Sequence, residues 1–566
     1  MAIGSARMLR TWLLPLSILL VSAIVVFFAC FQVDSGGDYS RIELIFLPNP
    51  NAAFDTLMNS GQVIAGVLGI AITVVAIVVE LAANRYTHRI TELFVHEPVN
   101  FAVMGYFVVT ALQGLAIGLL FDFQDAKGEP FIPYFGIAVA NSMLAFGLLI
   151  LLPYFAFVFE FLNPIQIVDR IRAHAMHVVA KATPSNTEES QSEAVRGVEQ
   201  LADVALNAME HQDKGVSMAS VDALQQLVID YQKIRVGLPD EWFRVEGELA
   251  HNPDFVSMSE GVLAAVTRRR IWLEMKVLRK YQTLYNEALN EMRDINYLIA
   301  INTRHIAERA LEVGHEELFD LSVKFFNTYL RATLNARDVR TAYNVLHQYR
   351  LLADAALKFD DGRRAIEIAK YFKYYGLLAF NMNLPFILET AAYDLCSLNE
   401  HAFDEGSPAG TELLKIFLQV DKESESAAQE NSLRGVRKAQ VKLATYYLVR
   451  GDEQLARHVF RDMEHERVER LASIRDELLG VTSSEFWEIS DRGENFDYLP
   501  PERKQMMLEF FSWFAKLAAP RGSSLPAELR AAPPPAVDAA KSGSGSHAIE
   551  MPSSASDPRS DEVKLT

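Results

Sequence analysis

Residues 78–94 read VVELAANRYTHRITELF, and this stretch decides how the chain is organised. It begins in apolar sequence and ends in charged sequence, and no proline or glycine marks the change. At the helical period, Ala82, Tyr86 and Ile90 continue one apolar stripe through the charged half. We therefore expect a helix that leaves a membrane here and runs on into water as an amphipathic extension, ending before Pro98.

The polar residues of this stretch are candidate functional positions at the membrane boundary: Glu80, Arg85, His88 and Arg89. Glu80 and Arg85 mark the boundary itself, where long charged side chains reach headgroup water. His88, Glu92 and His96 share one helix face and could offer three ligands to a metal ion. Such a row of His and Glu side chains on a helix is more often simply exposed to water, because metal sites generally need a further ligand from another element. No metal is therefore expected.

Four apolar runs are long enough to cross a bilayer core, which takes about 20 helical residues. They cover residues 11–31, 62–83, 101–121 and 134–161. The first run exceeds the apolar part of a signal peptide, which holds ~7–15 residues, so we expect an anchor that stays uncleaved. Sequence beyond residue 163 is too polar to span. The sequence thus predicts a four-span membrane domain over residues 1–161.

The distribution of charge around the spans predicts their orientation. Basic residues lie on one side of the membrane: Arg7, Arg10, Arg85, Arg89, Arg170, Arg172 and Lys181. The loops on the other side are acidic, as at Asp34, Asp38, Asp122 and Asp125. Lys and Arg near span ends favour the cytoplasmic face. The N-terminus and the C-terminus are therefore both expected in the cytoplasm.

Small residues recur at four-residue spacing on three of the spans, and small residues let membrane helices approach closely. They are Ala65, Gly69 and Thr73 on the second span, Gly114 and Gly118 on the third, and Gly136 and Ala140 on the fourth. We interpret them as helix-packing positions. Gln113 and Asn141 lie at similar depths on the third and fourth spans, where a mutual hydrogen bond would satisfy both amides. The alternative is a place for both on a transport pathway.

Residues 81–107, LAANRYTHRITELFVHEPVNFAVMGYF, resemble the hallmark segment of a family of bacterial predicted inner-membrane proteins catalogued as a domain of unknown function. The matching positions are Leu81, Ala82, Tyr86, Arg89, Phe94, Asn100, Gly105 and Phe107. Weaker similarity covers Val198–Leu224 and His251–Phe255, although Glu210–Val216 replaces the family's Ser-Pro-Gly-Ile-Asn-Asp-Pro and His88 replaces a proline. The resemblance implies a multi-pass protein of the bacterial inner membrane and no known activity.

From Ile165 onward, apolar residues recur three and four positions apart, which is typical of one helix after another. We expect a juxtamembrane helical domain over residues 162–300 and a second helical domain over residues 301–519. Residues 268–299 suggest one long helix. Residues 520–566, rich in Ala, Pro, Ser and Gly, are expected to be a disordered tail. The whole chain is thus predicted to be all-α.

Residues 443–463, LATYYLVRGDEQLARHVFRDM, have the spacing of a tetratricopeptide (TPR) helical hairpin. The positions that carry this pattern are Ala444, Tyr447, Gly451, Ala456 and Phe460. A weaker match around Ala365 is not separated from it by a multiple of the ~34-residue repeat. We therefore expect an irregular, TPR-like α-solenoid.

Composition and missing motifs narrow the function. A formal net charge of −18 argues against a nucleic-acid partner, which requires a basic surface. The sequence contains no P-loop, dinucleotide glycine fingerprint, HExxH or GxSxG motif, so neither an enzyme nor a cofactor is expected.

Two functions remain for the chain. The favoured one is a scaffold or sensor that sits in the lipid bilayer and binds a cytosolic protein through its solenoid. The alternative is an oligomeric ion channel or transporter, a homo-oligomer built on the four spans.

Overall fold

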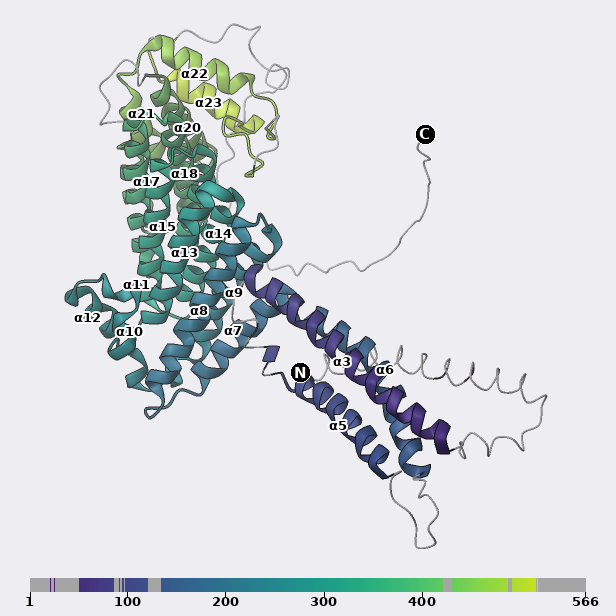
Figure 1. The fold of residues 1–566 in the computed structure, drawn as a ribbon. Coiled ribbons are helices and arrows are strands. Elements are labelled where there is room, and N and C mark those ends of the chain that lie inside the picture. The colour runs from purple at the N-terminus through teal and green to yellow at the C-terminus, as the bar shows by residue number, and fades with distance from the viewer. Residues whose placement is uncertain are drawn as a thin grey trace, which may run out of the picture.

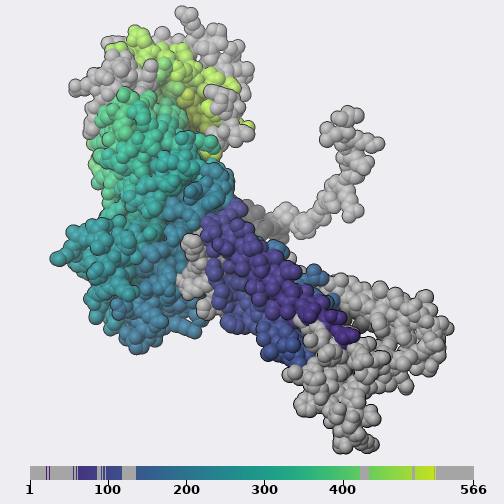
Figure 2. Space-filling view, viewed as in Figure 1, coloured from purple at the N-terminus to yellow at the C-terminus, as the bar shows by residue number. Residues whose placement is uncertain are grey.

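The computed structural model describes residues 50–85, 97–120, 134–420, 430–486 and 491–515, together with Val21, Val25, Thr91, Phe94, Val95 and Leu517. Across these residues the regular elements are α-helices and short 3-10 helices, which confirms the all-α prediction for this part of the chain. The molecule has two parts, a bundle of three long helices and an elongated stack of helices from whose side the bundle projects (Figures 1 and 2).

The bundle consists of α3 (Pro50–Arg85), α5 (Pro98–Leu120) and α6 (Tyr134–Phe161). The segments Gln62–Arg85, Pro98–Ile117 and Phe135–Phe161 are long and apolar enough to cross a membrane. The predicted second, third and fourth spans are thus confirmed as candidate membrane helices. The predicted first span, residues 11–31, lies outside the described residues except for Val21 and Val25.

The helix α3 is longer than a membrane span needs to be. It has 36 residues, which corresponds to about 54 Å, whereas a hydrocarbon core is about 30 Å thick. Its polar end continues without a break to Arg85, as the opening stretch of sequence predicted. The rest of the predicted extension, from Tyr86 to Ile90, lies outside the described residues.

One face of α3 packs against both α5 and α6. Its buried side chains are Ile64, Ala71, Val75, Val79 and Ala83. Their spacing places them on one side of a helix. Near the other end of the bundle, a Cβ on Gly136 of α6 would lie 3.2 Å from Cδ1 of Ile117 on α5. Glycine at this position therefore lets α5 and α6 approach closely.

The helical stack begins with α7 (Pro164–Ala180), α8 (Thr187–Glu210) and α9 (Lys214–Ile234). Short elements follow: η2 (Arg235–Gly237), η3 (Asp240–Phe243), α10 (Gly247–His251), α11 (Pro253–Val256) and α12 (Glu260–Arg269). Longer helices resume with α13 (Trp272–Glu291), α14 (Arg293–Glu312), α15 (Glu316–Asn335), α16 (Val339–Ala356), η4 (Asp360–Gly362), α17 (Arg363–Asn381) and α18 (Pro385–Asp404). The last are α19 (Gly410–Leu418), α20 (Glu430–Val449), α21 (Glu453–Met463), α22 (Val468–Gly480) and α23 (Pro501–Ser512).

These helices form two layers, as in an α-solenoid. The helices α8, α13, α15, α17 and α19 pack side by side in one layer, and α9, α14, α16, α18 and α20 pack side by side in the other. Each long helix buries one apolar face between the layers, which is why sequence with a helical period dominates this part of the chain.

Three of the turns between helices share one design, in which a residue with positive φ precedes an aspartate. The pairs are Gln212 with Asp213, Arg337 with Asp338, and Gly451 with Asp452. Each aspartate side chain accepts a hydrogen bond from the backbone N–H three residues later, at 3.2, 3.1 and 3.0 Å respectively. These bonds satisfy amides that have no partner within α9, α16 and α21.

The prediction of a single helix over residues 268–299 is wrong. Arg270 has a positive φ of 58° after α12, and Met292 leaves helical geometry with φ −152° and ψ 81°. The helices α13 and α14 fold back on each other so that both apolar faces enter one core. Asn296 supports the break, because its Nδ2 donates to the Tyr285 carbonyl at 2.7 Å.

The boundary expected between residues 300 and 301 falls inside α14. Buried residues on both sides of it belong to one hydrophobic cluster, which runs from the membrane bundle to α23. The predicted tail, residues 520–566, lies outside the described residues.

Candidate functional site: the junction between bundle and stack

The polar end of α3 is tied to the turn between α8 and α9. The Arg85 guanidinium lies 3.3 Å from Oδ2 of Asp213, the residue that also caps α9. The Arg85 side chain is half exposed, so the ion pair is worth at most about 1 kcal/mol. Its contribution is therefore to position the end of α3, and stabilisation of the fold comes mainly from elsewhere.

The same turn is linked to other turns along the stack. Gln212 donates from Nε2 to the Glu291 carbonyl at 3.4 Å, and Lys214 forms an ion pair with Asp294. Further along, Arg293 pairs with Asp338 at 3.1 Å, and Arg337 donates to the Met382 carbonyl at 3.2 Å. We call this series, from Arg85 to Met382, the turn row. It connects the end of a membrane helix to four successive hairpins.

Residues of the family hallmark hold the bundle together near the stack. The ring of Phe94 meets that of Phe161 edge to face, with centroids 5.4 Å apart. Asn100, only 8% exposed, donates a hydrogen bond to the Phe94 carbonyl and accepts one from the Tyr154 hydroxyl at 3.2 Å. Phe107 is buried between the helices. Three hallmark positions thus have a packing or hydrogen-bonding role.

The helix α7 fastens this end of the bundle from the side of the stack. The Arg170 guanidinium lies 4.1 Å from the centroid of the Phe161 ring. Burial lowers the pKa of Arg170, while the nearby carboxylates of Glu97 and Glu160 act in the opposite direction. Arg170 therefore brings together the start of α5, the end of α6 and the first helix of the stack.

The segment His251–Phe255, which also resembles the family more weakly, is held in place by a buried lysine. The Lys276 side chain is 0% exposed, and its ammonium donates to Glu199 at 2.6 Å, to Asn252 at 2.7 Å and to Asp254 at 2.5 Å. Burial would raise the pKa of Glu199 and of Asp254, but hydrogen bonds, including those from Lys276, and nearby positive charge lower both overall. Three partners satisfy all three ammonium protons.

The predicted polar positions of the membrane helices are not gathered into one site. Glu80 is exposed on α3, and Gln113 and Asn141 are each partly exposed. No hydrogen bond joins Gln113 to Asn141 in the described structure, so their pairing stays a prediction. His88 and Arg89 lie outside the described residues.

The predicted packing residues on α3 lie on its outer face. Ala65, Gly69 and Thr73 are exposed, with the Thr73 hydroxyl donating to the Gly69 carbonyl at 2.8 Å. A Cβ on Gly69 or on Gly114 would meet nothing within 4 Å among the described residues. The three residues on α3 are therefore not packed against α5 or α6. The side-chain surroundings of Gly118 are not among those that the structure describes.

The predicted hairpin of residues 443–463 is formed by α20 and α21, with Gly451 at φ 80° in the turn. Ala444, Tyr447 and Ala456 are buried, which allows the two helices to pack closely. Phe460 contacts Phe514 with ring centroids 4.7 Å apart. The assignment of this hairpin to the TPR class stays a prediction.

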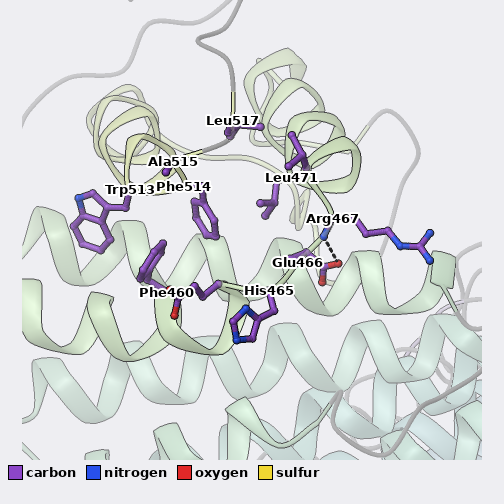
Figure 3. Close-up of a pocket in the computed structure, with 11 residues that line it drawn as sticks. Phe460, His465, Glu466, Arg467, Leu471, Trp513, Phe514, Ala515 and Leu517 are labelled. Atoms are coloured by element: carbon purple, nitrogen blue, oxygen red, sulfur yellow. Dashed lines mark hydrogen bonds between the residues drawn. The ribbon is translucent and has the colours of Figure 1, made fainter.

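A pocket of about 490 Å³ lies beside this hairpin, at the end of the stack away from the bundle. We call it the end pocket. Figure 3 shows Phe460, Leu471 and Phe514 turned toward a common space, whereas the guanidinium of Arg467 points away from it. The other apolar residues of its lining are Val468, Trp513, Ala515 and Leu517.

Several residues of the junction were missed by reasoning from sequence. Asp213 carried a signal, since an aspartate before a helix is an N-cap candidate, but nothing near it in sequence pointed to Arg85. Tyr154 and Arg170 carried none, because their partners lie on other helices. No group of three or more His, Cys, Asp or Glu that could hold a metal occurs among the residues described.

The fold is that of a membrane protein with a large helical domain attached to its candidate spans. Residues 9–236 match the profile of a family described as "Predicted membrane protein (DUF2254)", which confirms the resemblance inferred from residues 81–107. The match ends at η2, so the helices from α10 onward are an additional helical domain beyond the matched segment.

Other comparisons add little. No curated protein matches the chain. A solved structure titled "Circular tandem repeat protein with novel repeat topology and enhanced subunit contact surfaces" is 17% identical and covers 66% of this chain and 84% of its own. A TM-score of 0.29 is too low to show that the two proteins share a fold.

Proposed function

We propose that this chain is an integral protein of the bacterial inner membrane that presents its helical stack in the cytoplasm, as a scaffold or sensor that binds another protein. The basic flanks of the spans support this orientation. The proposed function does not require the junction to catalyse a reaction.

The junction is the observation that supports this function best. The membrane helices and the stack share one hydrophobic cluster, so the stack is attached through packed side chains. The turn row extends this attachment to the hairpins. A scaffold needs a fixed orientation at the membrane, and a sensor needs a stiff path between lipid and cytoplasm; this junction suits both.

The end pocket is the favoured surface for a protein partner. It lies far from the membrane end of the molecule, where a cytosolic protein has access. Its apolar walls, with Glu464 among the lining residues, fit an apolar side chain on a partner helix or loop.

The test uses full-length protein solubilised in detergent as bait for cytosolic proteins, followed by binding measurements with the purified candidate. Phe460→Ala should weaken that binding at least about tenfold, since it removes a central apolar contact. Val449→Ala, on the same hairpin but outside the pocket, is the matched control and should change nothing. Unaltered binding by the Phe460 variant would count against this surface.

The channel alternative has one observation in its favour. The outer face of α3 with Ala65, Gly69 and Thr73 has no neighbour from α5 or α6, so it can pack against another membrane helix, including one from a second copy. Ion flux through liposomes that changes with Gln113→Leu or Asn141→Leu would favour a pore over a scaffold.

A further inference from the structure

A segment near the end of the chain crosses the second layer of the stack. Residues 491–499, which we call the strap, connect α22 to α23 and lie on α16, α18 and α20. Arg492 binds both carboxylate oxygens of Asp394, at 2.6 and 3.2 Å, and both side chains are almost fully buried. The Tyr393 hydroxyl donates to Asp497 at 2.6 Å. The strap is therefore a fixed part of the surface.

The strap forms one wall of a pocket of about 500 Å³, which we call the strap pocket. Four aromatic rings contribute to its lining: Tyr343 from α16, Phe386 from α18, Phe496 from the strap, and Phe486. Three carboxylates, those of Glu389, Glu494 and Asp497, line it as well, together with Arg340. Phe386 and Phe486 remain exposed, although large aromatic side chains are usually covered.

The cations around this pocket already have partners. Arg340 pairs with Asp491 at 3.6 Å, and Lys438 pairs with Asp497 at 2.7 Å. The Lys442 ammonium donates to the Phe496 carbonyl at 3.1 Å. Within the described structure, neither Glu389 nor Glu494 has a hydrogen bond or an ion pair. The strap pocket therefore combines aromatic walls with two carboxylates, those of Glu389 and Glu494, that have no direct cationic partner in the described structure.

Glu389 is held at the pocket in an unfavourable environment for a charge. Burial raises its pKa, the nearby carboxylate of Asp497 raises it further, and Lys438 lowers it. Gly435 on α20 makes room for this side chain, because a Cβ there would collide with the Glu389 carboxyl group. An alanine at 435 would avoid the entropic penalty of glycine in a helix, but it would displace the carboxylate.

The aromatic rings of this pocket already bind a cation on another side. The Arg492 guanidinium lies 4.1 Å from the centroid of the Tyr343 ring and 5.6 Å from that of Phe496. Aromatic faces attract cations through the ring quadrupole, and aromatic cages are a common means of binding organic ammonium groups. The strap pocket offers rings of the same kind beside an unpaired carboxylate.

We propose that the strap pocket binds an organic cation, an alkylammonium or alkylguanidinium group whose charge lies against Glu389 and whose hydrocarbon lies against the rings. A free small molecule and the side chain of a lysine or arginine on another protein share this chemistry. The site is separate from the end pocket, so it can fail or succeed independently of the proposed protein partner.

The test measures binding of n-butylguanidinium and tetramethylammonium to the full-length solubilised protein by isothermal titration calorimetry. Uncharged n-butylurea is the matched neutral probe. Both cations should bind at least about tenfold more tightly than the urea, because their charge meets an unpaired carboxylate. Equal binding of butylguanidinium and butylurea would overturn the proposal.

Two variants locate the site. Glu389→Gln keeps the shape and should reduce cation affinity about tenfold or more while leaving butylurea unaffected. Phe386→Leu removes an exposed ring and should weaken both cations severalfold. Thermal melting establishes that each variant is folded. Cation affinity unchanged in folded Glu389→Gln protein would contradict the assignment.

Two further binding measurements define the ligand. Affinity for butylguanidinium should rise with pH through the raised pKa of Glu389, because the cation requires the ionised carboxylate. A short peptide with one arginine between apolar residues, compared with free butylguanidinium, distinguishes a protein side chain from a small molecule. A pH-independent affinity would argue against Glu389 as the binding group.

Discussion

The membrane bundle and the helical stack bury their helices in different ways. On α3 the buried Val75 and Val79 differ little in polarity from the exposed Ile70 and Ile77, because between Val63 and Val79 this helix is apolar on nearly all sides. In the stack, buried and exposed faces differ sharply in polarity, yet fully buried charges such as Lys276 and Glu274 also occur. In the described spans the buried polar side chains are Asn100 and Thr110. A membrane helix that is apolar on all sides can bury any of its faces, so its composition does not determine which face packs. In the stack, contact with water favours burial of the apolar face of each helix.

The largest expected effect comes from the buried charge that orders the stack. Lys276→Met leaves the Glu199 carboxylate without its ammonium partner and removes the shortest of the ion pairs to Asp254, and should lower the free energy of unfolding by about 3 kcal/mol. Denaturant titration of the solubilised protein measures this change. Lys280→Met, which removes a more exposed neighbour 3.2 Å from Asp254, should cost much less. Equal losses would mean that Lys276 is not the organising charge.

A buried carboxylate should make the stack sensitive to pH. Glu274 accepts from Gln232 at 2.7 Å and lies 3.6 Å from Arg235, with Tyr231 and His315 also nearby. Burial raises its pKa from 4.5 to about 7, and Arg235 opposes this.

At Glu274 the folded state therefore binds more protons than the unfolded state between these two values, so the contribution of this carboxyl group to stability falls as pH rises from 4.5 to about 7. Burial lowers the pKa of the neighbouring His315 from 6.5 to about 4, and this group contributes in the opposite direction. This contribution should amount to about 3 kcal/mol, since the pKa rises from 4.5 to about 7 and one unit of pKa corresponds to ~1.4 kcal/mol. Unfolding curves at several pH values measure it. The difference in stability between the unaltered protein and Glu274→Gln should show this fall with pH, and the difference from Glu287→Gln, an exposed position on α13, should not.

The amide in the bundle should have a smaller effect. Asn100→Ala removes the partner of the Phe94 carbonyl and of the Tyr154 hydroxyl, and should cost about 1–2 kcal/mol. Thermal melting in detergent, together with proteolysis near Phe94, reports the loosened end of the bundle. Gly105→Ala is the control, since a Cβ there meets nothing within 4 Å. A larger loss from the Gly105 variant would mean that another helix contacts that face.

The smallest effect is expected where the two regions meet. Asp213→Asn removes the charge that pairs with Arg85 but keeps an N-cap for α9, so stability should fall by less than about 1 kcal/mol. The difference from the unaltered protein should vanish in high salt, because exposed ion pairs are screened. A loss of several kcal/mol that persists in salt would show that the ion pair, more than apolar packing, attaches the stack.

The sequence predicted features that depend on nearby residues. Helical periods located the elements, the capping aspartate at residue 452 and Gly451 marked a real turn, and the hallmark from Leu81 to Phe107 led to the family. The failures involve distant partners. Asn100 and Tyr154 are 54 residues apart, and the break at Met292 arises because α13 and α14 share a core. Neither helical period nor turn chemistry reports such contacts.

By itself, the sequence determined that the chain is helical, that it has apolar segments of membrane length, and where polar helix replaces apolar helix after Val79, because these follow from local periodicity and the length of apolar runs. Only the tertiary structure decided which face of α3 packs, that Arg85 meets Asp213, and that the strap brings Phe496 beside Glu389. Those arrangements depend on which helices become neighbours, and that choice is made by packing across the whole core.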